Sequence, residues 1–390
     1  MMFLAMCVSQ RIQLFVGMML IVLFSACNIT KFVPQGDYLL NDVKIKVVDT
    51  KDVLPTDLTK YVQQHQNTEI LGFWKLQLGI YNTASLDTTK WTSKNAHKVG
   101  EAPVIFSPDM ADASVLQLTR AMNNKGYFRA EVDTAMTIKE RKVNLVYNVK
   151  AGSPYLIGDY VVDFDQQDLY DIAQSNRSAL LRSGDKFDAD VLNQERQRVA
   201  SAMRSRGYFY FDAEYIRFEA DSLRKEQRID VKMCLQPYVE QMSLEEQDRL
   251  FRQYNIANVY FHIDYDLDRI PTDEEMYASS RDGYIFTWVG KKLLRDKVLM
   301  RNCPIRPGDR YNERLVERAY ARMNQLAPIK YVDISFEPSS SNELDCHIVL
   351  SRNKLNSFSA EIEGTYSAGD WGVAAGMGYA NRNLFRGAEE

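Results

Sequence analysis

Two stretches of the sequence match each other: residues 112–128 (DASVLQLTRAMNNKGYF) and residues 193–209 (NQERQRVASAMRSRGYF). Each ends a helical pattern in a basic residue followed by Gly-Tyr-Phe, and the two glycines, Gly126 and Gly207, lie 81 positions apart. At that offset the apolar residues of the two stretches coincide at the spacing of one helix face. The coinciding pairs are Leu118 with Val199, Ala121 with Ala202, and Met122 with Met203. The chain therefore contains a repeated unit, and a repeat determines the whole fold.

Each glycine lies where a helix must end, a position that often takes the left-handed backbone conformation. After Gly126 the chain predicts a strand over residues 127–138 and, after a charged turn, a second strand over residues 143–149. After Gly207 the same order recurs, over residues 208–220 and 229–235. Each copy is thus a helix followed by two strands. The Gly-Tyr-Phe residues are interpreted as a helix cap with core aromatics, which identify the repeat but form no site.

A third, more diverged copy begins at Gly308-Asp309-x-Tyr311, which matches Gly184-Asp185-x-Phe187 of the second copy. Its helix ends at Leu326-Ala327-Pro328. Strands are predicted over residues 330–336 and 344–350. A strand and a helix also precede each copy: residues 43–48 and 58–64, residues 155–164 and 169–181, and residues 259–264 and 293–301. The order β-α-α-β-β predicts an α+β unit with one sheet covered by two helices.

This order, with a helix that closes on Gly-Tyr-Phe before a hairpin, resembles the polypeptide-transport-associated (POTRA) repeat. The resemblance implies three tandem units, at residues 39–154, 155–238 and 239–354, the third with an insertion. POTRA repeats imply a periplasmic location and contact with other polypeptides.

From Phe358 the sequence takes a period of two, in which one face alternates first with polar residues and then with glycine and alanine. Residues 358–366 and 371–379 are two such stretches, separated by a turn at Ala368-Gly369-Asp370. Each is about as long as a transmembrane β-strand, which needs roughly 9 to 11 residues. A soluble hairpin packed on the third repeat is the alternative.

The tail motif favours the membrane strands. Residues 378–389 (GYANRNLFRGAE) resemble the early barrel strands of the BamA/TamA superfamily, in which Gly-Tyr and Asn-Leu-Phe-x-Gly recur. The resemblance implies that residues 355–390 begin an outer-membrane β-barrel. Two strands cannot close a barrel, because open edges in lipid leave backbone groups unpaired. We therefore expect an N-terminal fragment of a longer protein. The lipidated TamL-like branch is the most similar branch.

The amino terminus has the layout of a signal peptide. Residues 14–24 (LFVGMMLIVLF) form an apolar run that follows Arg11 and precedes Ser25-Ala26. The run is shorter than the about 20 residues that a spanning helix needs. Small residues directly before Cys27 resemble a bacterial lipobox, although Phe24 departs from the usual Leu. The resemblance implies a signal peptide over residues 1–26, lipid attachment at Cys27 and a tether over residues 27–38. An ordinary secreted protein with an incidental Cys27 is the alternative.

Composition and motifs argue against other classes of function. The 48 basic and 52 acidic residues give a net charge of −4 without a basic stripe, so nucleic acid is not an expected partner. The four histidines are His65, His97, His262 and His347; no two lie at helical or strand-pair spacing, and no metal site is expected. No catalytic or cofactor-binding residue is found. Residues 364–369 lack the first glycine of a nucleophile elbow, and residues 376–381 fall short of a dinucleotide fingerprint.

The cysteines are expected to form no metal or redox motif. None of the five forms a CxxC motif. With Cys7 and Cys27 set aside, Cys234, Cys303 and Cys346 are expected to be buried free thiols, although one disulfide stays open.

The resemblance to the BamA/TamA superfamily implies assembly or translocation of outer-membrane polypeptides, without enzymatic activity, cofactor or metal. The predicted location is the outer membrane, with a lipid anchor and the repeats facing the periplasm. Unfolded or partly folded polypeptides are the expected partners. The alternative is a periplasmic adaptor that docks a TamB-like envelope-spanning protein and handles no client. Crosslinking along the repeat edges would discriminate between the two.

Overall fold

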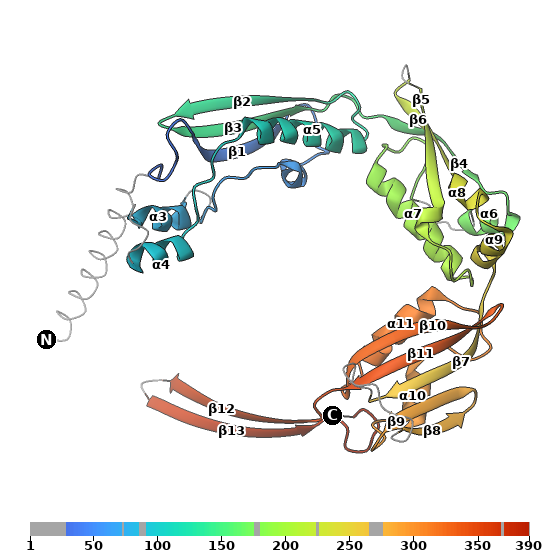
Figure 1. Cartoon of the computed structure of the whole chain (residues 1–390). Coiled ribbons are helices and arrows are strands. Elements are labelled where there is room, and N and C mark those ends of the chain that lie inside the picture. Colours follow the sequence, from blue (N-terminus) through green and yellow to red (C-terminus); the bar gives the residue numbers. More distant parts are fainter. Residues whose placement is uncertain are drawn as a thin grey trace. The chain divides into compact units, whose positions relative to one another are not determined.

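The computed structural model describes residues 29–71, 74–85, 91–174, 180–223, 226–264, 276–367 and 370–389. Figure 1 shows the elements in chain order. The chain divides into two compact units. Unit 1 comprises Met1–Asp159, Ser183–Val191 and Ser222–Asp230; unit 2 comprises Tyr160–Arg182, Leu192–Asp221 and Val231–Glu390. Cys27 and the signal segment lie outside the described residues.

The first repeat has the predicted order with an addition. Strand β1 (Leu39–Val47) is followed by the short helices α2 (Pro55–Leu58) and η1 (Thr59–Tyr61), and the long helix α5 (Pro108–Asn124) leads into β2 (Glu131–Lys139) and β3 (Lys142–Lys150). The sheet order is β1-β3-β2, with β1 parallel to β3. Helices α3 (Leu76–Thr83) and α4 (Trp91–Val99) are inserted between η1 and α5. The buried face of α5 supplies Leu118, Ala121 and Met122, the apolar positions of the repeat.

The second repeat contains β4 (Leu156–Asp163), α6 (Gln167–Gln174), α7 (Ala189–Arg204), the short helix η2 (Ala213–Tyr215), β5 (Ile216–Leu223) and β6 (Arg228–Leu235). The sheet order is β4-β6-β5, the same as in the first repeat. Val199 and Met203 of α7 are fully buried, as their counterparts are in α5. Helices α8 (Pro237–Glu240) and α9 (Leu244–Phe251) follow, and a capping box from Ser243 and Glu246 begins α9.

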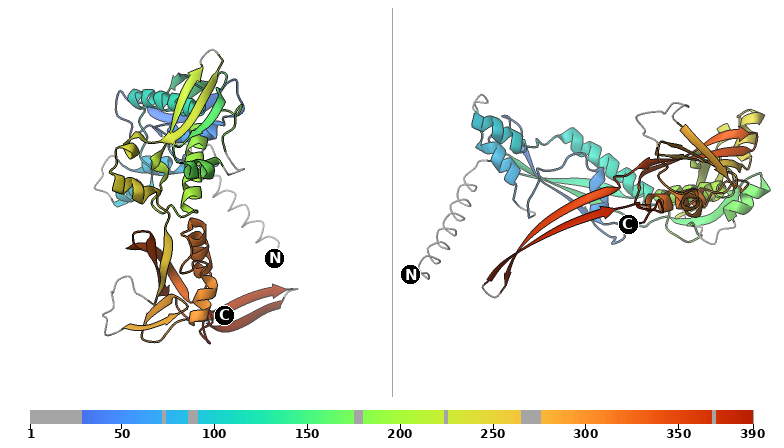
Figure 2. Two further views of the ribbon diagram at one scale, coloured as in Figure 1. Left: turned by 90° about the vertical axis from the view of Figure 1, so that its right-hand side faces the viewer. Right: turned by 90° about the horizontal axis from the view of Figure 1, so that it is seen from below.

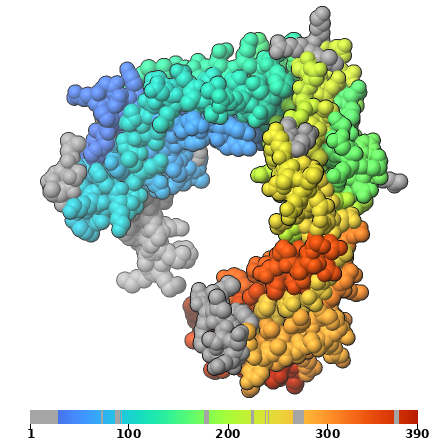
Figure 3. All heavy atoms as spheres, turned by 45° about the vertical axis from the view of Figure 1, so that its right-hand side comes forward, coloured from blue at the N-terminus to red at the C-terminus, as the bar shows by residue number. Residues whose placement is uncertain are grey.

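The third repeat has a larger sheet. It contains β7 (Asn255–Ile263), β8 (Met276–Arg281), β9 (Tyr284–Val289), α10 (Asp296–Asn302), α11 (Glu313–Asn324), β10 (Ile329–Ser340) and β11 (Glu343–Arg352). The sheet order is β10-β11-β7-β9-β8. Strands β8 and β9 form an inserted hairpin. Without it, the strand order is the same as in the first two repeats. Figure 3 shows one face of the repeats with all heavy atoms, coloured along the sequence. Each repeat has its own buried apolar core.

A two-stranded sheet ends the described chain. β12 (Asn356–Ser367) and β13 (Asp370–Asn381) pair in antiparallel register, from Asn356 opposite Asn381 to Ser367 opposite Asp370. Figure 2 shows this ribbon from two further directions. Among the described residues, no helix combines the length and the apolar character that crossing a membrane requires.

One predicted helix was wrong beyond its first turns. Residues 62–69 are extended, although a helix was predicted to reach Gln64. The buried side chains of Gln64 and Asn67 explain the difference, because they bond the backbone of residues 102–107 instead of facing solvent from a helix. Side-chain to backbone bonds of this kind compete with helix formation.

Candidate functional site: strand edges and a groove beside the first strand

Each sheet exposes two edge strands: β1 and β2 in the first repeat, β4 and β5 in the second, and β10 and β8 in the third. An edge strand presents a row of unpaired backbone N–H and C=O groups, which can pair with another extended chain. These edges are the structural basis for any contact carried by main-chain hydrogen bonds.

The edge of β1 is covered only at its start. Leu40 N–H donates to Val104 O at 2.8 Å, and Phe106 N–H donates to Tyr38 O at 2.9 Å. Farther along, Val48 N–H donates to Val149 O of β3 at 2.8 Å. Because backbone groups alternate sides along a strand, the N–H and C=O groups of Val43, Ile45 and Val47 face away from β3. The free edge of β1 is therefore residues 43–47.

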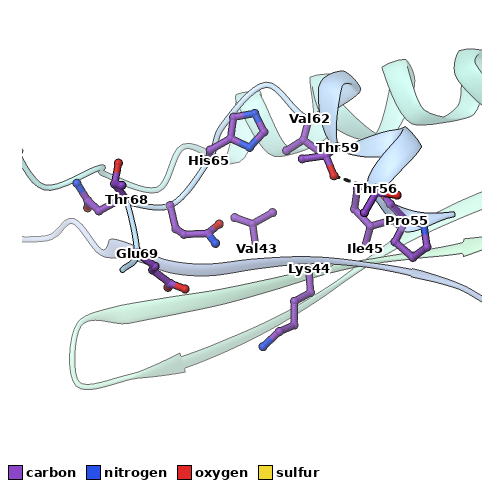
Figure 4. A pocket seen from close by; sticks show the side chains of 12 residues that line it. Val43, Lys44, Ile45, Pro55, Thr56, Thr59, Val62, His65, Thr68 and Glu69 are labelled. Atoms are coloured by element: carbon purple, nitrogen blue, oxygen red, sulfur yellow. Dashed lines mark hydrogen bonds between the residues drawn. The ribbon is translucent and has the colours of Figure 1, made fainter. Parts of the chain in front are cut away.

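A groove of about 380 Å³ runs beside this free edge (Figure 4). We call it the β1 groove. One side is Val43, Lys44 and Ile45 of β1, and the other is Pro55, Thr56 and Thr59 of α2 and η1. The far wall is the extended segment 62–69. The groove thus has a strand edge on one side and a second wall opposite it.

The far wall is held in place by two buried amides. Asn67 Nδ2 donates to Ala102 O at 2.7 Å, and its Oδ1 accepts from Val104 N–H at 3.1 Å. Gln64 donates to Ile105 O and accepts from Ser107 N–H. These bonds tie the far wall to residues 102–107 and satisfy the backbone groups there.

One lysine marks the end of the groove. Lys75 Nζ donates to the backbone carbonyl of Asn41, on the side of β1 away from β3. Burial lowers the pKa of Lys75, and Glu69, whose Oε1 lies 3.6 Å away, opposes this shift. The lysine therefore occupies the last edge carbonyl before the free stretch and leaves residues 43–47 open.

In the third repeat the corresponding edge is occupied by the chain itself. Strand β7 pairs with β11 on one side, as β1 pairs with β3, and with β9 on the other. The β7–β9 pairing is parallel and runs from Val259 opposite Tyr284 to Ile263 opposite Trp288. The first strand of a repeat can therefore accept a further parallel strand on this edge.

The ends of the repeats share one bonding pattern. Gly126 O accepts from Tyr155 N–H, and Tyr155 O accepts from Phe187 N–H. In unit 2, Gly207 O accepts from Tyr254 N–H and Tyr254 O accepts from Tyr311 N–H. In the same way Phe128 packs on Phe187, with ring centroids 5.6 Å apart, and Phe209 packs on Tyr311, with centroids 4.9 Å apart. The phenylalanine of Gly-Tyr-Phe thus touches the aromatic residue of the next Gly-Asp-x-aromatic motif.

A family model for POTRA, described as "Surface antigen variable number repeat", matches residues 43–152. This segment spans the first repeat from β1 through β3. The other repeats share its order of elements, and the second repeat ends in the same backbone bonding pattern at Gly207. Over residues 43–152 the chain is therefore similar to a POTRA domain. The shared pattern explains why the Gly-Tyr-Phe motif identified the fold.

Three solved structures illustrate what the chain is similar to. POTRA domains 3–5 of Haemophilus influenzae BamA are 13% identical, with 82% of this chain and 100% of that chain covered, at a TM-score of 0.40. The N-terminal domain of Omp85 from Thermosynechococcus elongatus is 12% identical, with coverage of 82% and 100%, at a TM-score of 0.24. CdiB from Acinetobacter baumannii is 8% identical, with coverage of 91% and 37%, at a TM-score of 0.23. No curated protein matches the sequence significantly.

The hairpin after the third repeat has two unlike faces. By register, one face carries Phe358 with Tyr379, Ala360 with Met377, Ile362 with Ala375, and Val373; the other carries serine, threonine, glutamate, alanine and glycine. The apolar face is exposed: Ile362 is 81% exposed and Met377 is 91% exposed. An exposed apolar face of this kind indicates a surface that contacts a membrane or another protein.

One contact between two histidines was not predicted from the sequence. His262 of β7 and His347 of β11 lie on neighbouring strands, with Nε2 of His262 3.1 Å from Nδ1 of His347. Burial, together with His347, lowers the pKa of His262 to about 4. The two residues are far apart in sequence, so only the parallel pairing of β7 and β11 brings them together. Within the described part of the chain, no three His, Cys, Asp or Glu residues converge as a metal site.

The three downstream cysteines, Cys234, Cys303 and Cys346, are buried free thiols, and none pairs as a disulfide. Burial raises the pKa of Cys303 to about 11, so its thiol stays protonated and unreactive at neutral pH. Cys27, the predicted lipid attachment residue, lies outside the described residues and stays a prediction.

Proposed function

We propose that this protein assists the insertion of polypeptides into, or their passage across, the outer membrane. Its POTRA repeats would receive unfolded or partly folded clients, and no cofactor, nucleotide or enzymatic step is involved. The observation that carries the proposal is the set of open strand edges, above all the free edge of β1 beside its groove. Main-chain bonding at an edge tolerates many client sequences.

The same proposal assigns the hairpin to the membrane. The exposed apolar face of β12 and β13 supports contact with lipid, and Phe358, Tyr379 and Trp371 near its ends suit the aromatic girdles of transmembrane strands. We take these strands as the beginning of a membrane β-barrel, with the POTRA repeats in the periplasm.

Lipid attachment at Cys27 is part of this proposal. Metabolic labelling with a clickable fatty acid, followed by mass spectrometry of the amino-terminal peptide, tests it directly. We expect label on Cys27 and none on a Cys27→Ser variant. An unlabelled mature chain that begins elsewhere would rule out the anchor.

Photocrosslinking tests the function itself. A photoreactive residue is placed at exposed positions on the strand edges of the full chain in membranes, and the captured species are identified by mass spectrometry. We expect several different outer-membrane precursors. Capture of one fixed partner, such as a TamB-like envelope-spanning protein, would show instead that the chain is a docking adaptor.

A further inference from the structure

We propose that the free edge of β1, residues 43–47, is the seat for a client segment, which adds to the first POTRA sheet as a strand parallel to β1. The segment alternates apolar and polar residues. This inference rests on the proposed function and goes further: it names the edge, the direction of the bound strand and the residue pattern that fits.

The third repeat supplies the template. There β7 occupies the place of β1, and β9 fills the neighbouring edge in parallel register. The register of β1 on β3 ends at Val47 opposite Val149, and the register of β7 on β11 ends at Ile263 opposite Leu350. Counted back from these ends, residues 43–47 correspond to residues 259–263, which are the residues that β9 pairs.

The backbone of the free edge is ready for a partner. Val43, Ile45 and Val47 direct their N–H and C=O groups away from β3, and no backbone bond from another segment reaches them within the described chain. Before this stretch the edge is already closed, by residues 104–106 and by Lys75 on Asn41 O. The vacancy is thus confined to the stretch that β9 fills in the third repeat.

The side chains select an amphipathic strand. Val43, Ile45 and Val47 lie against the apolar core, and the buried Val62 lines the groove opposite them. Lys44 and Lys46 are exposed on the other face of β1. In the third repeat the inward residues of β9 are apolar: Phe286 is fully buried and stacks on Phe261 with ring centroids 5.2 Å apart.

A bound segment would therefore place alternate apolar residues toward Val43, Ile45 and Val62, and polar residues beside the two lysines. Transmembrane β-strands carry this alternation with a period of two. The β1 groove accordingly fits an unfolded strand of an outer-membrane barrel better than it fits a helix or a small polar solute.

The test uses the full chain in detergent and a fluorescent peptide with the sequence of β13, residues 370–381, which alternates apolar with small or polar residues. A permuted peptide of the same composition, without alternation, is the control. We expect the alternating peptide to bind and the permuted one to bind at least ten times more weakly. Equal binding of the two peptides would overturn the residue pattern.

Two variants locate the binding. Ile45→Pro removes one N–H from the free edge and leaves the β1–β3 ladder intact, since proline is tolerated where the N–H of an edge strand faces solvent. We expect at least a tenfold loss of peptide affinity, with an unchanged circular dichroism spectrum. A photoreactive residue at Lys44 gives a measurement that does not depend on the folding of this variant, with Met136 on β2 and Leu116 on α5 as exposed controls in the same unit.

The crosslinks decide among three results. Capture at Lys44 alone supports the β1 groove, and a photoreactive group at the peptide amino terminus should then attach nearer Val43 than Val47 if the strand is parallel. Capture at Met136 and not at Lys44 overturns this inference and leaves the proposed function intact. If neither the peptide nor any barrel precursor is captured at any repeat edge, the proposed function fails as well.

Discussion

Glu195 of α7 is a fully buried carboxylate. It is paired on two sides by Arg198, with Nε 2.6 Å from Oε2 and Nη2 2.7 Å from Oε1, and it accepts from the Tyr160 hydroxyl at 3.3 Å. The backbone N–H of Leu180 donates to the same carboxylate. Burying such a pair costs free energy. Removing one partner destabilises the fold further, because it leaves the other charge buried and unpaired.

We predict that Glu195→Ala lowers the free energy of unfolding by about 3 to 5 kcal/mol. Urea unfolding followed by circular dichroism measures the change. Glu219→Ala is the matched control, since Glu219 pairs with Lys232 and Arg217 on an exposed strand and should matter little. Equal effects of the two variants would contradict the buried-pair argument.

His262 gives a second prediction, on pH dependence. Its pKa is lowered to about 4 in the folded chain from an ordinary value of 6.5. The unfolded chain therefore takes up this proton first as the pH falls. The contribution of His262 is fully present above pH 6.5 and is lost between about pH 6.5 and 4, amounting to about 1 to 2 kcal/mol after discounting for its partial exposure.

The comparison is between wild-type chain and His262→Gln, with urea unfolding at several pH values in this range. The variant should show a smaller loss of stability on acidification than the wild-type chain. His65→Gln, at an exposed position, should not change the slope. An unchanged slope for His262→Gln would mean that the histidine pair carries no such linkage.

The helix-ending glycines operate at the scale of elements. Gly126 and Gly207 both have positive φ, of 83° and 103°. A side chain at Gly126 would meet the backbone carbonyl of Phe187, whereas one at Gly207 would press on the flexible Arg310 side chain and touch the Cβ of Gln253 at ordinary contact distance. The two copies of one motif therefore differ in what surrounds them.

We predict that Gly207→Ala costs about 1 kcal/mol, the penalty of the left-handed conformation, and that Gly126→Ala costs more than about 2 kcal/mol because the backbone must also shift. Thermal and urea unfolding of the two variants, side by side, check the order. A larger effect at Gly207 would show that the contact with Phe187 is not the limiting one.

The repeats could be predicted from sequence because each copy carries local signals: a helix stop at Gly126 or Gly207, an alternating strand such as residues 143–149, and a charged turn. The inserted elements could not. Helices α3 and α4 and strands β8 and β9 have no counterpart in the other copies, so the repeat comparison gave no guide to them.

The candidate site was less accessible to prediction than the fold. The β1 groove depends on strand order and on the buried amides of Gln64 and Asn67, which look like ordinary polar residues in the sequence. The pairing of His262 with His347 likewise requires that β7 and β11 be neighbours. Strand order is a property of the assembled sheet, and spacing along the chain does not contain it.

At the scale of the whole molecule, the two faces of the β12–β13 hairpin give a matched pair of variants. Val373 lies on the apolar face and the adjacent Ala374 on the other. If the hairpin enters lipid, Val373→Arg should cost about 2 to 4 kcal/mol near the membrane centre and raise the fraction of protein extracted from membranes by urea. Ala374→Arg should be tolerated, and equal extraction of both variants would argue for a soluble hairpin.

Strand β9 is tethered to the sheet that it completes, so its effective concentration at the edge of β7 exceeds that of any free segment. A visiting strand would have to unfold part of the third repeat to displace it. Under the proposed function, the edge of β7 is therefore closed to clients, whereas the free edge of β1 is open to them. Deletion of the β8–β9 hairpin would expose the edge of β7 without the addition of a domain.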